Sequence, residues 1–344
     1  MQIKPADVVS VQLKDKEIIN VTEYEITSDL YEAEDSFSIT LGEYEIEPTR
    51  GELAVIYING KRELTGVVEN IARGFSSAGL MLSISGRSIM SFLTTNHVKK
   101  GFSTNKLTLK QIADKLLVDI RKIEGFGALF KNVTYQDGAD NLDKDPKDKR
   151  QIEAGSSIFE VLDETAKRRG LMLFDTPDGG LVFGKPKAAG EAVFKIQNSR
   201  EGCDVISGEY SEDVSGLYND FLIITQTDSD KPEKVNARGT FEAPSETLPF
   251  KRQYVLSIDE DEKTPKEKAR AIFEAQQSEA FKLSYSIPSH AQNGTNYRIN
   301  ELIDVEDSIL NTAGTFLIYG RTFSRSVGGG AVTSLNLGLK GVRV

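Results

Sequence analysis

The segment from residue 155 to residue 186 constrains the fold of this chain most strongly. Its sequence is GSSIFEVLDETAKRRGLMLFDTPDGGLVFGKP. Ser157 and Glu160 have the spacing of a capping box, in which each side chain bonds to the backbone N–H of the other residue. This spacing predicts a helix from residue 158 that ends near Gly170, the position of a C′ glycine. The predicted buried stripe of this helix consists of Ile158, Val161, Leu162 and Ala166.

A hairpin is predicted directly after this helix. Residues 171–175 and 181–184 are short apolar runs, and Asp178-Gly179-Gly180 lies between them. Glycine supplies the positive φ that a tight hairpin turn needs. A capped helix that leads into a hairpin indicates an α/β module.

The residues before this module have the pattern of β-strands. Residues 36–41 alternate apolar and polar side chains, and residues 53–58 form a β-branched run. Asn59-Gly60 is a hairpin-turn signal, and a return strand is predicted to follow it. Several short strands at close spacing predict a small antiparallel barrel or sandwich, and we expect the first β-barrel domain over residues 1–97.

Helical patterns begin after residue 98. Thr108 and Gln111 have the spacing of a second capping box, and an apolar face follows on residues 109–120. Residues 137–151 are almost all polar and predict an exposed loop. We therefore expect an α/β module over residues 98–190.

Strand patterns return in the last part of the chain. Residues 222–224 are the clearest core strand, and residues 228–251 predict a loop or weak strands. Thr264 opens a third capping box, which predicts another helix. We expect a second β-barrel domain over residues 191–344, with an inserted loop and helix around residues 228–281.

The order of these patterns predicts the fold class. It is α+β and mainly β, with two small antiparallel β-barrel domains and intervening α/β modules. A β-rich region occurs both before and after the helical module, and this pattern indicates two copies of one fold in the chain.

The composition limits what the chain can bind. The net charge is −10 and the pI is near 5.0, whereas a protein that neutralises DNA phosphates is usually basic. DNA that merely slides through a channel needs only weak contact, so this role stays open. The N-terminal residues lack the apolar region of a signal peptide, and no run approaches the roughly 18 apolar residues of a spanning helix. We expect a chain made in a cytoplasm, without membrane insertion.

The sequence offers almost no catalytic chemistry. The two histidines, His97 and His290, are far apart, and motifs for zinc sites, phosphate loops and nucleophile elbows are absent. Cys203 is the only cysteine, and with an acidic neighbour it is interpreted as a small side chain at a strand edge rather than a reactive thiol. With 52 acidic residues, a sugar-cleaving carboxylate pair stays open on inspection, but no Trp or aromatic cluster marks a sugar cleft. We predict no catalytic, cofactor-binding or metal-binding residues and no cofactor.

Three further features each have a functional and a structural interpretation. Asp143, Asp145 and Asp148 are spaced as in a calcium loop, but the central glycine and closing glutamate are missing, so a solvated loop is favoured. The basic run at residues 167–169 lies at the predicted C-terminal turn of a helix, where cations meet the dipole favourably, and this interpretation is preferred to a phosphate site. Arg87 follows a strand end and is either a subunit contact or a surface residue.

Several segments carry a resemblance to a known family. They are GRSIMSFL at residues 86–93, KLTLKQIADKLL at residues 106–117 and the helix-hairpin segment at residues 155–186. A helix, an alternating strand from Phe281 and the glycine run at residues 328–330 continue the order. In this order the chain resembles the baseplate hub or tail proteins of Mu-like contractile-tailed phages. This is the late control D family, related to the hub part of type VI secretion spike proteins.

The resemblance implies a structural role in a phage or prophage tail and no enzymatic activity. It implies two quasi-equivalent barrels in each chain and a homotrimer, the baseplate hub, that links the tail tube to the spike and forms a central conduit for DNA. The partners would be further copies of the chain and the tail tube and spike proteins, with DNA as a transient passenger. The location would be the virion, after synthesis in the bacterial host cytoplasm. An acidic lumen would keep DNA from adhering.

Two other classes of function stay open on the sequence. One is a tail-associated cell-wall hydrolase, which a muralytic assay would detect. The other is a host-surface binding module, such as an adhesin or a carbohydrate binder, and the lack of Trp counts against it.

Overall fold

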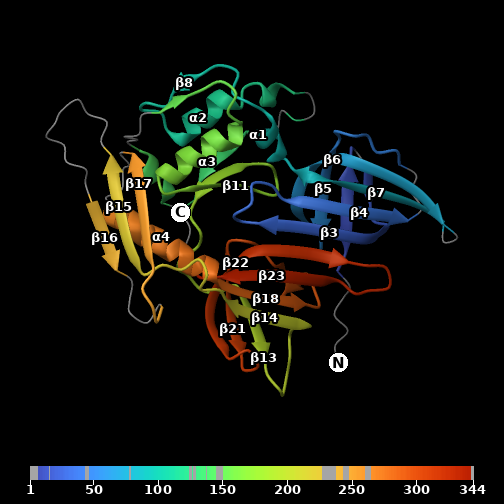
Figure 1. Cartoon of the computed structure of the whole chain (residues 1–344). Coiled ribbons are helices and arrows are strands. Elements are labelled where there is room, and N and C mark those ends of the chain that lie inside the picture. The colour runs from blue at the N-terminus through green and yellow to red at the C-terminus, as the bar shows by residue number, and fades with distance from the viewer. Residues whose placement is uncertain are drawn as a thin grey trace.

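The protein is built mainly from β-strands, with a few helices gathered in two places (Figure 1). The α+β, mainly β class predicted from the sequence is confirmed. No helix in the described ranges has the length and apolar character needed to span a membrane. The computed structural model describes residues 7–14, 16–42, 46–76, 79–123, 126, 129–136, 138–144, 150–226, 238–242, 248–259 and 265–341.

One thirteen-stranded sheet contains strands from both ends of the chain. Its first half has the hydrogen-bonded order β2-β1-β5-β6-β7-β4-β3. The alternation predicted over residues 36–41 gives β4 one buried face, as expected for a strand over a core. The strands of this half are β1 (Val9–Leu13), β2 (Lys16–Ile18), β3 (Val21–Asp29), β4 (Ser36–Gly42), β5 (Leu53–Ile58), β6 (Lys61–Ser76) and β7 (Gly79–Ser88).

The second half of the sheet comes from the C-terminal part of the chain. Its hydrogen-bonded order is β13-β21-β22-β23-β18-β14. A short hairpin of β19 (Ala291–Gln292) and β20 (Thr295–Asn296) lies beside it in sequence. The strands of this half are β13 (Phe194–Asn198), β14 (Ser207–Glu212), β18 (Phe281–Ile287), β21 (Glu301–Asp307), β22 (Thr312–Arg325) and β23 (Val332–Gly338).

The two halves of the sheet repeat one strand order. When β1, β3, β4, β5, β6 and β7 are matched in chain order to β13, β14, β18, β21, β22 and β23, the two orders become identical. The direction of one strand differs, because β1 is antiparallel to β5 whereas β13 is parallel to β21. The repetition suggested by the sequence is therefore visible in the topology.

Backbone pairing of β3 with β22 joins the two halves (Figure 1). The first part of β22 pairs with β21, and its last part, after a bulge, pairs with β3. One hydrophobic cluster contains side chains from both halves, including Ile26 and Phe323. The described strands form an open hydrogen-bonded path, and closed barrels are not seen in it.

The α/β module has a core of its own. Both capping boxes predicted from the sequence are present, at Thr108 with Gln111 and at Ser157 with Glu160. The predicted hairpin is also present, and its second strand pairs in parallel with β9. The elements are α1 (Ser91–Thr95), β8 (Phe102–Ser103), α2 (Leu109–Leu116), β9 (Val133–Tyr135), β10 (Gln151–Ile152), α3 (Ile158–Arg168), β11 (Met172–Asp175), β12 (Leu181–Gly184) and the 3-10 turns Ile120–Lys122 and Ala139–Asp143.

Replacing Ser157 by Ala is expected to lower the free energy of unfolding by about 1 kcal/mol. The Ser157 hydroxyl accepts a hydrogen bond from the Glu160 N–H at 3.1 Å, and the Glu160 carboxylate accepts one from the Ser157 N–H at 3.0 Å. Chemical denaturation measures the loss. Ser157→Thr keeps the acceptor oxygen and is the control that should stay close to the wild type, whereas an alanine variant of wild-type stability would contradict the assigned cap.

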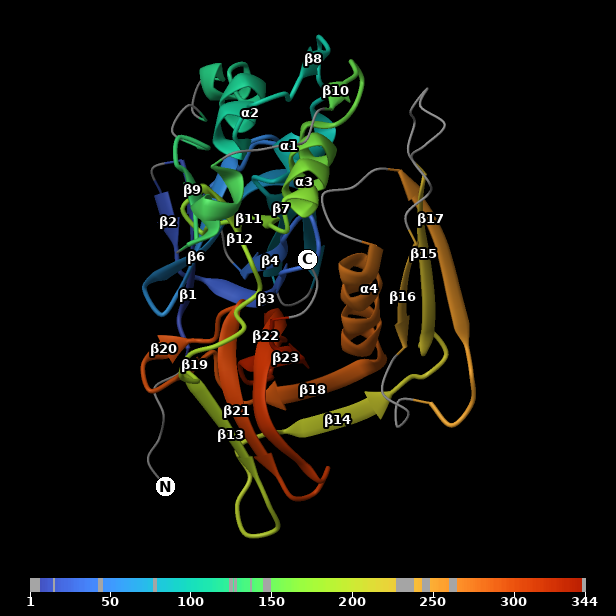
Figure 2. The same cartoon turned by 90° about the vertical axis from the view of Figure 1, so that its left-hand side faces the viewer.

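A small domain is inserted between β14 and β18 (Figure 2). It consists of a three-stranded sheet and one helix around a separate apolar cluster. β16 lies within residues 228–251, where the sequence predicted a loop or weak strands, and Thr264 of the third capping box lies outside the described residues. The elements are β15 (Asp220–Gln226), β16 (Arg238–Glu242), β17 (Gln253–Asp259) and α4 (Pro265–Ala280).

Candidate functional site

The most exposed strand of the large sheet is β14. All six of its residues are exposed, and among the described strands it pairs with β18 alone. Its other side presents backbone N–H and C=O groups that can receive a further strand. Its sequence, SGEYSE, has neither the lysine nor the proline that commonly blocks edge pairing. β14 is therefore a candidate docking strand, and Figure 2 shows it running from the large sheet toward the inserted domain.

A second free edge lies at the end of β6. β5 covers β6 only as far as Val67, and Val68 bonds to the backbone of Gly51 and Glu52. Beyond Val68, β6 pairs with β7 on one side, and no strand in the described ranges covers the other side. Phe75 on this edge is 86% exposed. An exposed aromatic ring beside an uncovered backbone marks a second candidate docking edge.

A buried ion pair joins the two halves of the sheet. Arg321 on β22 donates to the Glu63 carboxylate on β6 at 2.7 Å, and each side chain is 4% exposed. Arg321 also donates to the Tyr297 carbonyl at 2.8 Å and to the Ser28 hydroxyl at 3.1 Å. Asn296 donates to Glu63 at 2.7 Å. Because these charged groups bond to one another, the network holds the halves together rather than presenting a reactive group.

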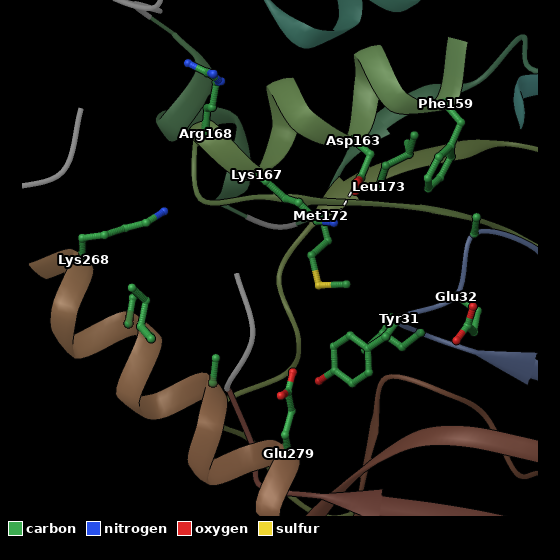
Figure 3. Close-up of a pocket in the computed structure, with 15 residues that line it drawn as sticks. Tyr31, Glu32, Phe159, Asp163, Lys167, Arg168, Met172, Leu173, Lys268 and Glu279 are labelled. Carbon is green, nitrogen blue, oxygen red and sulfur yellow. Dashed lines mark ion pairs between the residues drawn. The ribbon is translucent and has the colours of Figure 1, made fainter. Parts of the chain in front are cut away.

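A cleft of about 700 Å³ opens between the α/β module, the β3–β4 turn and the inserted helix (Figure 3). Helix α3 forms one wall with Phe159 and Lys167, and α4 forms the opposite wall with Glu279. Tyr31 and Met172 lie between the two helices. The cleft therefore exists because three separately packed parts of the chain meet there.

The chemistry of this cleft is that of a contact surface. Asp163 and Lys167 on α3 neutralise each other at 2.7 Å. Among the residues that the structure describes, those that line the cleft include neither histidine nor cysteine. A mixture of apolar side chains with charges of both signs fits contact with a protein segment better than bond-breaking chemistry.

A smaller cavity of about 300 Å³ contains two carboxyl groups, Asp35 from the β3–β4 turn and Asp175 from the end of β11. Burial raises the pKa of Asp35 to about 6, against the hydrogen bond from Ser28 and the charge of Arg321. Burial, and after it the charge of Asp35, raises the pKa of Asp175 well above its ordinary value. The two acids come from different parts of the chain, so this cavity couples the β-sheet to the α/β module.

Replacing Asp35 by Asn is expected to flatten the pH dependence of stability between about pH 4 and pH 6. The folded-state pKa of about 6 exceeds the ordinary value of 3.8, so the folded protein holds the proton more tightly. The linked stabilisation is complete below about pH 4 and is lost as the pH rises through about 6. Between pH 4 and pH 7 the wild type should lose about 2–3 kcal/mol more stability than the variant in denaturant titrations.

The matched control is Glu32→Gln, which changes an exposed acid in the same turn. It should retain the wild-type pH dependence. If Asp35→Asn and Glu32→Gln show the same pH profile as the wild type, Asp35 does not carry the buried proton.

The residues with catalytic potential lie apart from one another. His290 is fully buried, with Nε2 bonded to the Tyr24 hydroxyl at 2.7 Å and Nδ1 bonded to the Thr333 hydroxyl at 2.9 Å. Burial lowers the pKa of His290 to about 4, so the ring is neutral at physiological pH. His97 and Cys203 are both exposed. Within the described residues, no three His, Cys, Asp or Glu side chains gather as a metal site.

Asp143 has a structural role in the α/β module. Its carboxylate pairs with Arg169, and both side chains are 1% exposed. It also accepts a hydrogen bond from the Leu109 N–H at 2.7 Å, which places a negative charge at the start of α2. Asp145 and Asp148 lie outside the described residues.

Arg87 has carboxylate partners within the chain, and so do Lys167 and Arg169 of the basic run at residues 167–169. Arg87 donates to Glu34 and to Glu69, each at 2.6 Å. Lys167 and Arg168 occupy the last turn of α3, as the dipole argument predicts. Sequence reasoning missed Asp35 and the two free edges, because buried charge and long-range strand pairing leave no periodic signal.

The N-terminal strands of the chain match a known protein family. Residues 8–88 match the family model of the N-terminal domain of the GpP-like baseplate assembly protein of phage Mu. No curated protein matches the sequence. The resemblance to baseplate and tail proteins of Mu-like phages, stated from the sequence, is confirmed.

Solved structures of tail proteins share the fold over nearly the whole chain. The tail protein from Neisseria meningitidis MC58 is 22% identical, with 97% of each chain covered and a TM-score of 0.83. The 43 kDa tail protein of prophage MuSo2 from Shewanella oneidensis is 21% identical, with 96% of this chain and 98% of that chain covered and a TM-score of 0.76. A component of the E. coli type VI secretion system is 12% identical, with 95% and 76% covered and a TM-score of 0.55. At these identities the likeness shows a shared fold.

Proposed function

We propose that this chain is the trimeric baseplate hub of a phage or prophage tail. Three copies form a ring that links the tail tube to the spike and surrounds a central conduit for DNA. The observation that carries the proposal is the repetition of one strand order in the two halves of the sheet. With two quasi-equivalent halves in each chain, a ring of three chains presents six similar units to a six-fold tube and three chains to a three-fold spike.

The proposal divides the chain into three parts. Residues 1–97 and 191–344 form the two barrel units, and residues 98–190 form the α/β module between them. The inserted domain of β15, β16, β17 and α4, which overlaps the insertion expected around residues 228–281, belongs to the second unit, since it lies between two paired strands, β14 and β18. Exposed strand edges on both units support an assembly. A strand that already exists in a neighbouring unit can pair with such an edge, so no new strand has to form.

The partners of the ring would be tail tube and spike proteins, and its location would be the virion. DNA would pass through the lumen without binding tightly, which the net charge of −10 favours. The role is structural rather than enzymatic, and the ion pair of Asp163 with Lys167 in the cleft of Figure 3 supports this.

Light scattering on a size-exclusion column tests the proposal. We expect a mass near three times 37.9 kDa. A monomer at all concentrations, both alone and with tail tube or spike protein added, would contradict the ring. A muralytic assay on the same sample should be negative, and a positive result would favour a tail-associated cell-wall hydrolase instead.

A further inference from the structure

We propose that β14 of one chain adds as a strand to the free end of β6 in a second copy of the chain. The register is the one that β3 and β22 already use within a single chain. The inference deepens the proposed function, because it names the contact that would build the ring. It depends on the equivalence of the two halves, which the strand pairings fix residue by residue.

Two bulges align β6 with β22. In the first half, the pairing of β6 with β7 shifts between Val68 and Asn70. In the second half, the pairing of β22 with β23 shifts between Ile318 and Gly320. In each case one residue is skipped at the same place in the strand order, so Asn70 corresponds to Gly320.

The remaining strands agree with this alignment. In the first half, Gly86 on β7 pairs with Val68 on β6 and with Phe37 on β4. In the second half, Leu337 on β23 pairs in the same way with Ile318 on β22 and with Leu283 on β18. Phe37 pairs with Ile26 on β3, and Leu283 pairs with Tyr210 on β14. Ile26 and Tyr210 are therefore equivalent, and the register of β14 relative to β6 follows without adjustment.

The pairing inside the chain is the template. Asp29 to Tyr24 on β3 pair with Gly320 to Arg325 on β22. When this register is applied to the equivalent strands, residues Asp213 to Gly208 on β14 of one chain pair with residues Asn70 to Phe75 on β6 of the next chain. At the centre of this contact Ser211 lies opposite Ala72, as Thr27 lies opposite Thr322 in the template.

The backbone groups needed for this pairing point in the required direction. The Asp213 N–H bonds to the Ala280 carbonyl at 2.9 Å, toward the β18 side. Backbone groups alternate in direction along an antiparallel strand, so those of residues 208, 210 and 212 point to the free side. In the template the Leu30 N–H bonds to the Tyr319 carbonyl at 2.7 Å, which gives β3 the same alternation toward β22.

The side chains of the two edges are complementary. On the β6 edge, residues 70–75 carry one charged group, Arg73. The β14 edge carries Glu209, Glu212 and Asp213. In the proposed register Arg73 lies opposite Tyr210 and diagonal to Glu212, on the same face of the sheet, where opposite charges attract.

The geometry of the contact favours a closed ring of copies. The two edges differ, so each chain uses β14 toward one neighbour and β6 toward the other. Such a heterologous contact forms either a closed ring or an open filament. The intrachain joint between β3 and β22 is the same type of contact, so it and the interchain joint alternate around the ring.

Disulfide trapping tests the register. In a Cys203→Ser background, Ala72→Cys and Ser211→Cys are combined in the full-length chain. Both positions are exposed in the single chain, and the proposed pair is of the non-hydrogen-bonded type, whose Cα atoms are about 4.5 Å apart and can be bridged. Under mild oxidation we expect interchain disulfides in most chains, with a ladder on non-reducing gels that ends at three chains.

Two matched variants serve as controls. Thr27→Cys with Thr322→Cys is the equivalent pair inside one chain, where the two hydroxyls are 3.1 Å apart. It should form a disulfide within each chain and no covalent link between chains. Ala72→Cys with Ser207→Cys lies four residues out of register and should cross-link at least tenfold less.

A charge reversal tests the same contact without cysteines. Arg73→Glu should weaken association of the chains about tenfold, and adding Glu212→Arg should restore it.

The outcomes separate this inference from the proposed function. A trimeric mass without the cross-link between residues 72 and 211 overturns the strand pairing and leaves the hub proposal standing. A cross-linked ladder that runs past three chains supports the strand pairing and overturns the trimeric hub. Equal cross-linking of the out-of-register pair, or a monomer that never cross-links, overturns the pairing.

Discussion

Arg321→Met is expected to lower the free energy of unfolding by about 3–5 kcal/mol. The substitution removes the guanidinium that neutralises Glu63 at 2.7 Å, in a place where both side chains are 4% exposed. The remaining carboxylate is then buried without its counter-charge, which is more costly than losing a surface pair. The joint between the halves also loses the hydrogen bonds to Tyr297 and Ser28. Urea or guanidinium denaturation of the purified protein measures the change.

A double-mutant cycle shows whether the pair itself is responsible. Glu63→Gln keeps an acceptor for Asn296 and leaves Arg321 as the unpaired charge. In the double variant both charges are gone, so its loss should be smaller than the sum of the two single losses by about 2 kcal/mol or more. Additive losses would mean that the singles act through packing, for example through the contact of the Arg321 guanidinium with the Phe323 ring at 4.1 Å.

The parts of the fold that sequence reasoning predicted well are those with local signals. The helices α2 and α3 begin at their capping boxes, and the hairpin after α3 contains its glycine turn. Each of these signals lies within a few residues of the element that it specifies. Strand β4 is similar, since alternation along six residues is sufficient to predict its buried face.

The parts that were not predicted depend on contacts between distant residues. The pairing of β3 with β22 joins residues that are almost 300 positions apart in the sequence. Neither strand carries a sequence pattern that identifies its partner strand. Glu63 and Arg321 look like outward-facing polar residues in their strands, yet both are buried because they face each other where the two halves of the sheet meet. β14 has no alternation of apolar residues because all six of its residues are exposed, so no period marks it as a strand.

The candidate site shows the same division. The sequence contains no catalytic motif of the local kind, and the structure places His97, His290 and Cys203 in separate surroundings. The acidic neighbours of Asp143 in sequence raise the question of a calcium site. Its actual partner is Arg169, which comes from the end of a helix that folds back onto it.

Gly86→Ala is expected to lower the free energy of unfolding by at least about 3 kcal/mol, the upper end of the range for overpacking. A Cβ at this position would overlap the carbonyl oxygen of Val67 and would lie 2.9 Å from its carbonyl carbon and 3.1 Å from the Phe37 ring. The backbone of β6 has little room to retreat, because Val68 bonds on its other side to Gly51 and Glu52. Denaturation of the purified variant measures the loss.

The control is Gly74→Ala, in the same pair of strands. A Cβ there meets only the end of the Met81 side chain, at 3.9 Å, so stability should change by less than about 0.5 kcal/mol. A Gly86 variant as stable as this control would show that β6 can shift away. Such a shift would also move the bulge at Glu69, and with it the end of β6 that we propose as the docking edge. The glycine of the GRSIMSFL segment is therefore needed because β6 and β7 approach closely there, and a disruption of this approach should weaken both folding and assembly.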